Sequence, residues 1–255
     1  MRSSVELKDG NESFLLANLS KEDPKIIKEK NSSTPDYAAS LSKVFLAAEY
    51  VKLLKQDKTL NKEIQIKKRD LVGYGTDVLS DLIRGRNSIN IDVLTIMGLM
   101  IKYSCNSSTH ILASQFLMDR NTRYKDVIKF WAWRGKNLNL KKVKELNYFS
   151  LQDFLKIFKE IYSGKDGYWD ILRFTLKSSR NIYYLFDQQE LEILGSKSGT
   201  IKIGNIYYVN DFGVFRCKDK TYFMGALVKD KSISAAVKRI RKIGKNLVAI
   251  AKKKK

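Results

Sequence analysis

The hydrophobic pattern of this chain changes period three times along its 255 residues, and these changes limit the fold more than any other feature. Residues 12–30 carry two short apolar stretches separated by Ser20-Lys21-Glu22-Asp23-Pro24, which is typical of a β-hairpin. The middle of the chain has apolar residues at helical spacing, and the last third alternates as strands do before a final amphipathic helix. A hydrophobic content of 44% indicates a folded protein.

The elements can be placed approximately. Helices are predicted over residues 40–54, 90–103, 109–118, 124–131 and 150–162, the last opening with a capping-box-like Ser150-Leu151-Gln152-Asp153. Strands are predicted over residues 192–203, 206–216 and 222–228. A further helix is expected to begin near Ser232. Its buried face is expected to consist of Ile233, Val237, Ile240, Ile243 and Leu247.

This order predicts an α+β fold. An antiparallel sheet built from both chain ends and packed with helices, plus an inserted all-helical subdomain, satisfies the order with short connections. We expect a single domain over residues 1–255, with the α/β part at about 1–55 and 165–255 and the helical part at about 56–164.

The formal net charge of +21 has two interpretations. It is either the lysine-rich surface of a compositionally biased proteome or an attraction to an anionic partner such as a cell-wall polymer, a membrane or nucleic acid. The absence of any nucleic-acid-binding motif disfavours nucleic acid. No run approaches the ~18 apolar residues of a membrane span, and no apolar segment follows Met1-Arg2-Ser3-Ser4, so neither a transmembrane segment nor a signal peptide is predicted.

The reactive residue types are few. Cys105 and Cys217 lie far apart and predict no disulfide framework, and with the single histidine, His110, they make no usual zinc site. We therefore expect neither a metal nor a cofactor. A Ser-His-Asp triad would have to use His110, around which nothing resembles a nucleophile elbow. If a serine is activated, lysine is the expected base.

Ser40 and Lys43 carry the first reactive pattern, Ser40-Leu41-Ser42-Lys43. Positions i and i+3 of a helix lie on one face, so the lysine amine could reach the serine hydroxyl and act as its base. The free amides of a helix N-terminus at Ser40 would supply half of an oxyanion hole. In a chain so rich in lysine, this pattern alone is weak.

Two further short patterns follow in order. Ser104-Cys105-Asn106 falls between two apolar helices, where a loop could aim Ser104 and Asn106 into a cleft; an ordinary helix-capping pair is the alternative. Lys197-Ser198-Gly199-Thr200 falls on the first predicted strand of the last third. There Gly199 leaves room for another backbone or a ligand, or marks a plain bulge.

The three patterns together resemble the S-x-x-K, S-D-N and K-T-G motifs of serine β-lactamases and penicillin-binding proteins. The resemblance to the class A β-lactamase-like branch covers nearly the whole chain. It implies that Ser40 is the nucleophile, Lys43 the general base and Ser104 a proton shuttle. Asn106 would bind a substrate amide, Lys197 and Ser198 with the Gly199 strand would hold a substrate carboxylate, and the backbone N–H groups of Ser40 and Thr200 would form the oxyanion hole.

Two departures from the family pattern stand out. Cys105 replaces the usual Asp of the middle motif. Where class A enzymes have E-x-x-L-N, with a Glu that positions the deacylating water, this chain has Gly135-Lys136-Asn137-Leu138-Asn139. Asn139 would keep its place in that motif, but Gly135 stands at the Glu position. The only nearby carboxylate, Glu145, has the wrong spacing. Glu145 and Asn139 are nevertheless the residues that could serve deacylation.

We therefore expect a serine hydrolase that forms an acyl-enzyme with β-lactams and deacylates slowly. A penicillin-binding D,D-peptidase or another peptidoglycan-directed acyl-serine hydrolase is the first alternative, and a catalytically silent binding protein on the same fold is the second. The expected partner is a small-molecule β-lactam or a peptidoglycan-like peptide, with contact to the anionic cell envelope through the basic surface. The resemblance implies an extracytoplasmic location.

Overall fold

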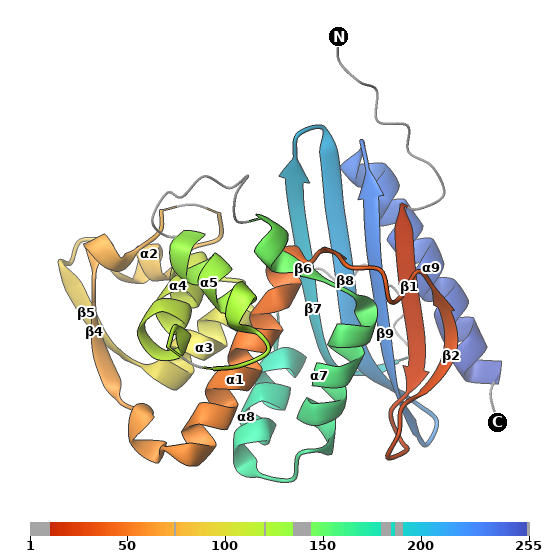
Figure 1. The fold of residues 1–255 in the computed structure, drawn as a ribbon, viewed down its shortest axis with the longest axis horizontal. Helices are drawn as coiled ribbons and strands as arrows, with labels where there is room; N and C mark the ends of the chain where they lie inside the picture. Colours follow the sequence, from red (N-terminus) through yellow and green to blue (C-terminus); the bar gives the residue numbers. More distant parts are fainter. Residues whose placement is uncertain are drawn as a thin grey trace. The chain divides into compact units, whose positions relative to one another are not determined.

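The computed structural model describes residues 11–73, 75–119, 121–134, 144–179, 185–186 and 191–253 (Figure 1). The chain forms two compact units. Unit 1 consists of the described parts of residues 1–41, 149–159 and 182–255, and unit 2 of those of residues 42–148 and 160–181. The prediction that residues 1–255 form a single domain stays a prediction. Among the described helices, none is both long and apolar enough to cross a membrane.

Unit 1 is built on a five-stranded antiparallel sheet, as the sequence predicts. Both chain ends contribute, in the order β2-β1-β9-β8-β7. The strands are β1 (Glu12–Asn18), β2 (Lys25–Lys30), β7 (Glu192–Ile203), β8 (Ile206–Cys217) and β9 (Lys220–Asp230). The predicted N-terminal hairpin is confirmed as β1–β2, with a shift in register between Leu16 and Ala17. Strand β7 is an edge of the sheet, which matters for the site described below.

Helix α9 (Ile233–Lys253) covers one face of this sheet (Figure 1). Ile240, Ile243 and Leu247 are buried among sheet residues such as Val209, in agreement with the prediction. Val237 is partly buried against the same cluster. The inward orientation predicted for Ile233 is wrong, because it is the first residue of the helix and 43% of its surface is exposed.

The opposite face of the sheet packs against α7 (Leu151–Ser163), whose first nine residues belong to unit 1. The rings of Phe154 and Phe158 lie 4.7 and 4.8 Å from that of Phe212, centroid to centroid. Before the helix, the predicted capping box is confirmed. The Asp153 amide donates to Ser150 Oγ, and the Ser150 amide donates to the Asp153 carboxylate, at 3.2 and 3.1 Å.

Unit 2 is mainly helical. Its helices are α1 (Lys43–Gln56), α2 (Val78–Leu82), α3 (Val93–Lys102), α4 (Asn106–Leu112), α5 (Lys125–Arg134) and α8 (Gly167–Lys177), with a π-helical turn at Ala113–Leu117 after α4. Short 3-10 turns cover Ala39–Ser42, which begins in unit 1, and Lys58–Leu60, Lys68–Asp70 and Lys144–Asn147. Two-residue strands occur at β3 (Asp36–Tyr37) in unit 1 and at β6 (Tyr148–Phe149), where the chain returns to unit 1.

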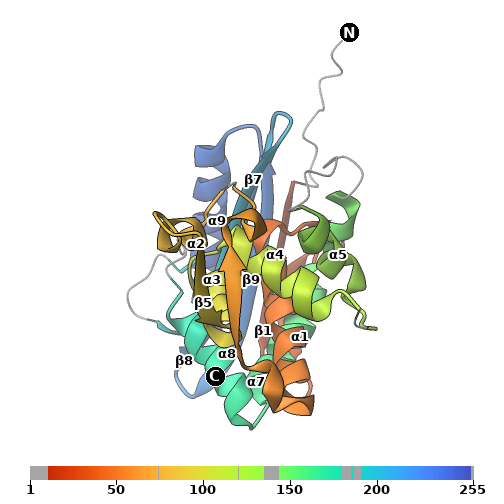
Figure 2. The same ribbon diagram turned by 90° about the vertical axis from the view of Figure 1, so that its left-hand side faces the viewer.

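The inserted region is not all-helical, and the prediction is wrong on this point. Strands β4 (Glu63–Lys67) and β5 (Ser88–Asp92) form a two-stranded antiparallel sheet (Figure 1). Residues 90–92 therefore belong to a strand and not to the helix predicted from Asn90. The chain leaves β5 directly into α3 (Figure 2), where the Asp92 carboxylate accepts from the Thr95 amide at 2.8 Å and caps the helix.

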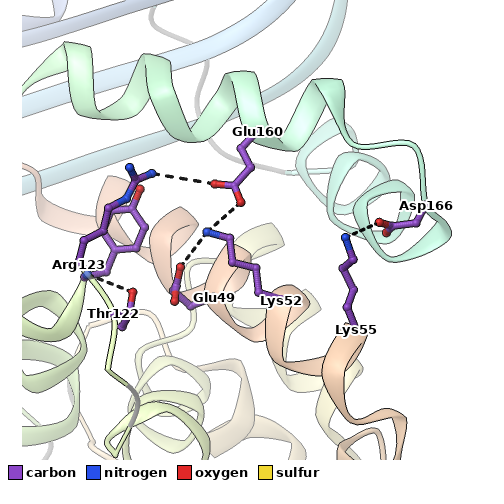
Figure 3. A network of polar contacts seen from close by, with 8 residues as sticks. Glu49, Lys52, Lys55, Thr122, Arg123, Glu160 and Asp166 are labelled. Atoms are coloured by element: carbon purple, nitrogen blue, oxygen red, sulfur yellow. Dashed lines mark hydrogen bonds and ion pairs between the residues drawn. The ribbon is translucent and has the colours of Figure 1, made fainter.

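A network of polar contacts holds the C-terminal half of α1 in place within unit 2 (Figure 3). The Lys52 ammonium lies 3.0 Å from the Glu49 carboxylate and 2.8 Å from that of Glu160. Lys55 pairs with Asp166 at 2.8 Å, one turn further along. Networks of this kind hold a helix better than isolated surface pairs. The same helix begins at Lys43, so its orientation bears on the site.

Candidate active site

Ser40 lies in a tight, strained turn of unit 1. The sequence predicts an α-helix from Ser40, but residues 39–42 form a 3-10 turn and the α-helix begins at Lys43. Ala39, directly before the serine, has φ +50°, a left-handed conformation that is uncommon for a residue with a side chain. Such strain persists only where the surroundings enforce it, and it is frequent at functional sites.

The segment before Ser40 is fastened to the sheet. The Asn210 side-chain amide, on β8, donates to the Tyr37 carbonyl at 2.7 Å. The Asp36 carboxylate pairs with the Lys229 ammonium of β9 at 2.8 Å. Asp36, Tyr37 and Asn210 are all buried. These contacts set where the chain enters the strained turn, and they explain how the conformation of Ala39 is maintained.

Gly199 on β7 receives the backbone of this turn. A Cβ atom added to Gly199 would lie 2.9 Å from the Ser40 backbone nitrogen and 3.2 Å from that of Leu41. Real Cβ atoms essentially never come that close, so only glycine allows this approach. The close backbone contact anticipated for Gly199 is thus present, and its partner is the predicted nucleophile. Thr200, the next residue on the edge strand, is exposed.

Lys197 is fully buried on the same strand. Its ammonium donates to the Ser198 carbonyl at 3.1 Å. Burial lowers its pKa to about 7, and the nearby Asp211 carboxylate opposes this shift without cancelling it. Asp211 lies opposite Ser198 in the β7–β8 register and accepts a hydrogen bond from the Leu185 amide at 2.9 Å.

Lys43, the first residue of α1 in unit 2, is surrounded by hydrogen-bond partners. Its ammonium lies 2.6 Å from the Ser104 carbonyl, 3.2 Å from the Ser104 hydroxyl and 2.8 Å from Oδ1 of Asn106. It also lies 4.6 Å from the ring centroid of Trp131, whose indole N–H donates to Ser42 Oγ at 3.0 Å. The structure therefore brings the lysine of the first motif to both polar residues of the second.

A left-handed residue makes this arrangement possible. Ser104, between α3 and α4, has φ +58°, which lets its carbonyl and hydroxyl both face Lys43. Asn106 is the first residue of α4, and its backbone N–H donates to the Thr76 carbonyl at 2.9 Å. Its side-chain nitrogen would lie 2.5 Å from a Cβ added to Gly75, which has φ +66°. A glycine is required at position 75 for both reasons.

Asp77 stabilises the turn that contains Ser104, Cys105 and Asn106. Its carboxylate accepts from Cys105 Sγ at 3.3 Å and from Ser107 Oγ at 2.5 Å. It also accepts from the Ser80 hydroxyl at 2.8 Å. Burial raises the pKa of the Cys105 thiol, so this residue brings no charge to the motif. The carboxylate missing at position 105 is instead supplied by a residue 28 positions earlier.

The roles predicted for these residues stay predictions, and several residues that contact them were not found from the sequence. Asp77, Gly75, Asn210 and Trp131 were not identified, since nothing in their local pattern marks them. The predicted pair Ser40 and Lys43 straddles the division of the chain, with Ser40 in unit 1 and Lys43 in unit 2. Glu145 lies in the 3-10 turn Lys144–Asn147, but its side chain, like Gly135 and Asn139, is outside the described residues.

Comparison with known proteins identifies the family of this chain. Residues 5–251 match the model of the beta-lactamase enzyme family, so the chain belongs to that family. No curated protein sequence matches it.

Solved structures show the same fold at low identity. A β-lactamase from Chitinophaga pinensis DSM 2588 superposes with a TM-score of 0.77 at 17% identity, covering 95% of this chain and 94% of that one. A class A β-lactamase representative from Bacteroides cellulosilyticus DSM 14838 gives 0.74 at 16%, with coverages of 97% and 95%. A mutant of PBP-A, in an acyl-enzyme complex with penicillin G, gives 0.69 at 18%, with coverages of 94% and 89%. The α+β fold is that of class A β-lactamases.

Proposed function

We propose that this protein is an acyl-serine hydrolase in which Ser40 forms an acyl-enzyme with β-lactams. The observation that carries the proposal is the set of hydrogen bonds between Lys43 and two oxygens of Ser104 and one of Asn106. Two motifs that are 61 residues apart in sequence meet at one amine. Ser40 stands three residues before Lys43, in the 3-10 turn that leads into α1. Residues at this spacing on a helix share one face, which supports Ser40 as the partner of Lys43.

The chemistry of the three oxygens suits a lysine that acts as a base. A neutral amine has two N–H donors and one lone pair. The Ser104 carbonyl and Asn106 Oδ1 can only accept, so they would take the two N–H groups. The Ser104 hydroxyl can donate to the lone pair or relay a proton from it. Lys43 would thus take the Ser40 proton and pass it on through Ser104.

The acylation step can be written with all atoms accounted for. Ser40 Oγ attacks the β-lactam carbonyl carbon, and its proton moves to Lys43 Nζ. The amide C–N bond breaks, and the ring nitrogen takes a proton through Ser104 Oγ, which recovers one from Lys43. The product is a serine ester. During attack the carbonyl oxygen becomes negative, and the N–H groups of Ser40 and Thr200 would stabilise it.

Substrate binding is assigned to the remaining motif residues. Lys197 and Ser198 would hold the substrate carboxylate, and Asn106 would bind the substrate amide with its side-chain nitrogen. Gly199 supports this assignment because it allows the Ser40 backbone to lie against the strand that carries Lys197 and Thr200.

Deacylation is expected to be slow. The sequence has Gly135 where the family motif has a water-activating Glu, and Glu145 has a different spacing. An ester in an oxyanion hole still needs a base beside the attacking water. This departure also favours the second candidate, a penicillin-binding D,D-peptidase acting on peptidoglycan-like peptides. We assign the protein to an extracytoplasmic location because both substrates would be met there.

The test is intact-protein mass spectrometry after exposure to penicillin G, together with turnover of a chromogenic cephalosporin. A single adduct on the wild-type protein, absent from Ser40→Ala, is the expected result. A burst of cephalosporin turnover followed by a slow phase would support slow deacylation. Labelling that survives Ser40→Ala would overturn the nucleophile. Rapid steady turnover without an adduct would instead reveal another base, and its loss in Glu145→Gln would identify that residue.

A further inference from the structure

The basic charge of unit 1 is concentrated in one element. Residues 231–255 contain ten Lys and Arg and no Asp or Glu. In the rest of unit 1, fourteen Lys and Arg are balanced by fourteen Asp and Glu. A lysine-rich proteome would add cations throughout the chain, so it does not explain why the net charge of this unit resides in α9 and its flanks.

The cations of α9 form a continuous exposed face. The buried side of the helix lies on the sheet (Figure 1), and on the other side seven cationic residues are exposed: Lys238, Arg239, Arg241, Lys242, Lys245, Lys252 and Lys253. The spacing of Lys238, Arg241, Lys242 and Lys245 puts them in one stripe. At 1.5 Å per residue, the exposed cations from Lys238 to Lys253 extend over about 22 Å of the helix, a length comparable to several lipid headgroups.

An apolar hollow borders this stripe. It has a volume of about 680 Å³ and lies between α9 and the β1–β2 hairpin. Phe14, Leu247 and Ile250 contribute its apolar wall, while Lys28 and Lys242 stand at its rim. Glu12 is the one carboxylate among the described residues that line it, and it pairs with Lys30 at 3.0 Å. Cations beside an apolar surface complement a phosphate headgroup joined to an acyl chain.

We propose that the exposed face of α9 docks the protein on an anionic phospholipid surface. Basic residues close to such a surface each contribute an attraction that salt screens. A lipid explains the combination of cations and apolar hollow better than a nucleic acid does. Residues 233–253 include no aromatic side chain, and stacking on aromatic rings is a main contribution to single-strand binding.

The experiment measures co-sedimentation of the full chain with phosphatidylcholine vesicles that contain either no phosphatidylglycerol or about 30% of it. The α9 variant Lys238→Gln/Lys242→Gln/Lys245→Gln removes three charges from the stripe. The matched control, Lys58→Gln/Lys62→Gln/Lys68→Gln, removes three exposed charges from unit 2. At about fivefold per lysine, the α9 variant should lose on the order of 10²-fold in partitioning, and the control only a few-fold.

Three results would overturn the proposal: equal losses in the two variants, equal binding to vesicles with and without phosphatidylglycerol, or persistence of binding in 1 M salt. Competition by inorganic polyphosphate at the same phosphate concentration as the lipid would point to a soluble polyanion and would also overturn it. Circular dichroism and penicillin labelling of each variant verify that the fold and Ser40 remain intact, since none of the six lysines belongs to the candidate active site.

Discussion

Unit 1 and unit 2 each bury one lysine of the candidate site, and the surroundings of the two lysines differ. Lys43 in unit 2 faces three oxygen atoms and an indole ring. Lys197 in unit 1 lies on an edge strand, where burial lowers its pKa to about 7 despite the attraction of Asp211. The surroundings of each lysine therefore favour a different chemical role for its amine. We expect Lys43 to exchange a proton with Ser104, and we expect Lys197 to bind an anion in its charged form.

Replacing each lysine in turn is the most direct test of whether the two lysines have different roles. Lys43→Ala should slow acylation by ~10²–10⁴, the usual effect of losing a general base. Lys43→Arg should not restore it, since a guanidinium stays protonated. Stopped-flow acylation by a chromogenic cephalosporin measures both rates.

The matched change in unit 1 should behave differently. Lys197→Ala should weaken recognition of the substrate carboxylate, and Lys197→Arg should recover part of it because the positive charge remains. Equal and mild effects of the two alanine variants would contradict the division of roles.

The next largest effect is expected at Gly199. Gly199→Ala would put a Cβ atom 2.9 Å from the Ser40 nitrogen, so the turn must move. A displacement of about 1 Å can cost ~10²-fold in rate, and acylation should fall by roughly that factor. Gly98→Ala is the control, because a Cβ there meets no atom within 4 Å. Normal acylation in Gly199→Ala would mean that Ser40 does not depend on its contact with β7.

A pH series sharpens the assignment of Lys197. Its lowered pKa means that the side chain is charged below pH 7 and becomes neutral above it. Acylation by penicillin G, relative to its methyl ester, should therefore fall by up to tenfold per pH unit above about 7. Taking the ratio removes the effect of Lys43 on both substrates. A ratio that stays constant from pH 6 to 9, in stopped-flow measurements, would assign carboxylate binding to another residue.

The smallest catalytic effect is expected at Asp77. Asp77→Asn weakens the support of Cys105 and Ser107, and should lower the free energy of unfolding by about 1–3 kcal/mol, with a loss of acylation below about tenfold. Asp81→Asn, in the helix α2 that follows Asp77, removes an exposed pair with Arg84 and should cost less than about 1 kcal/mol. Chemical denaturation of both variants decides whether Asp77 holds the turn.

Long regular elements were predictable because their side chains report the period of the backbone. Strands β7, β8 and β9 are eleven or twelve residues long and are separated by recognisable turn residues, and the buried face of α9 repeats over 21 residues. Strand β5 was not predicted because Ile89 and Ile91 continue into the apolar start of α3. Only pairing with β4, where Ile89 faces Ile66 and Ile91 faces Ile64, separates strand from helix.

The reactive residue types and their order could be predicted from the sequence alone, because the three motifs are short and local. The sequence also determined the sheet from both chain ends, since that follows from period and connection length. Three features could be found only in the folded structure. They are the Asp77 carboxylate that contacts the Ser104-Cys105-Asn106 motif, the close approach of the Ser40 backbone to Gly199, and the burial of Lys197. These depend on contacts between segments up to about 160 residues apart, and no local pattern encodes such contacts.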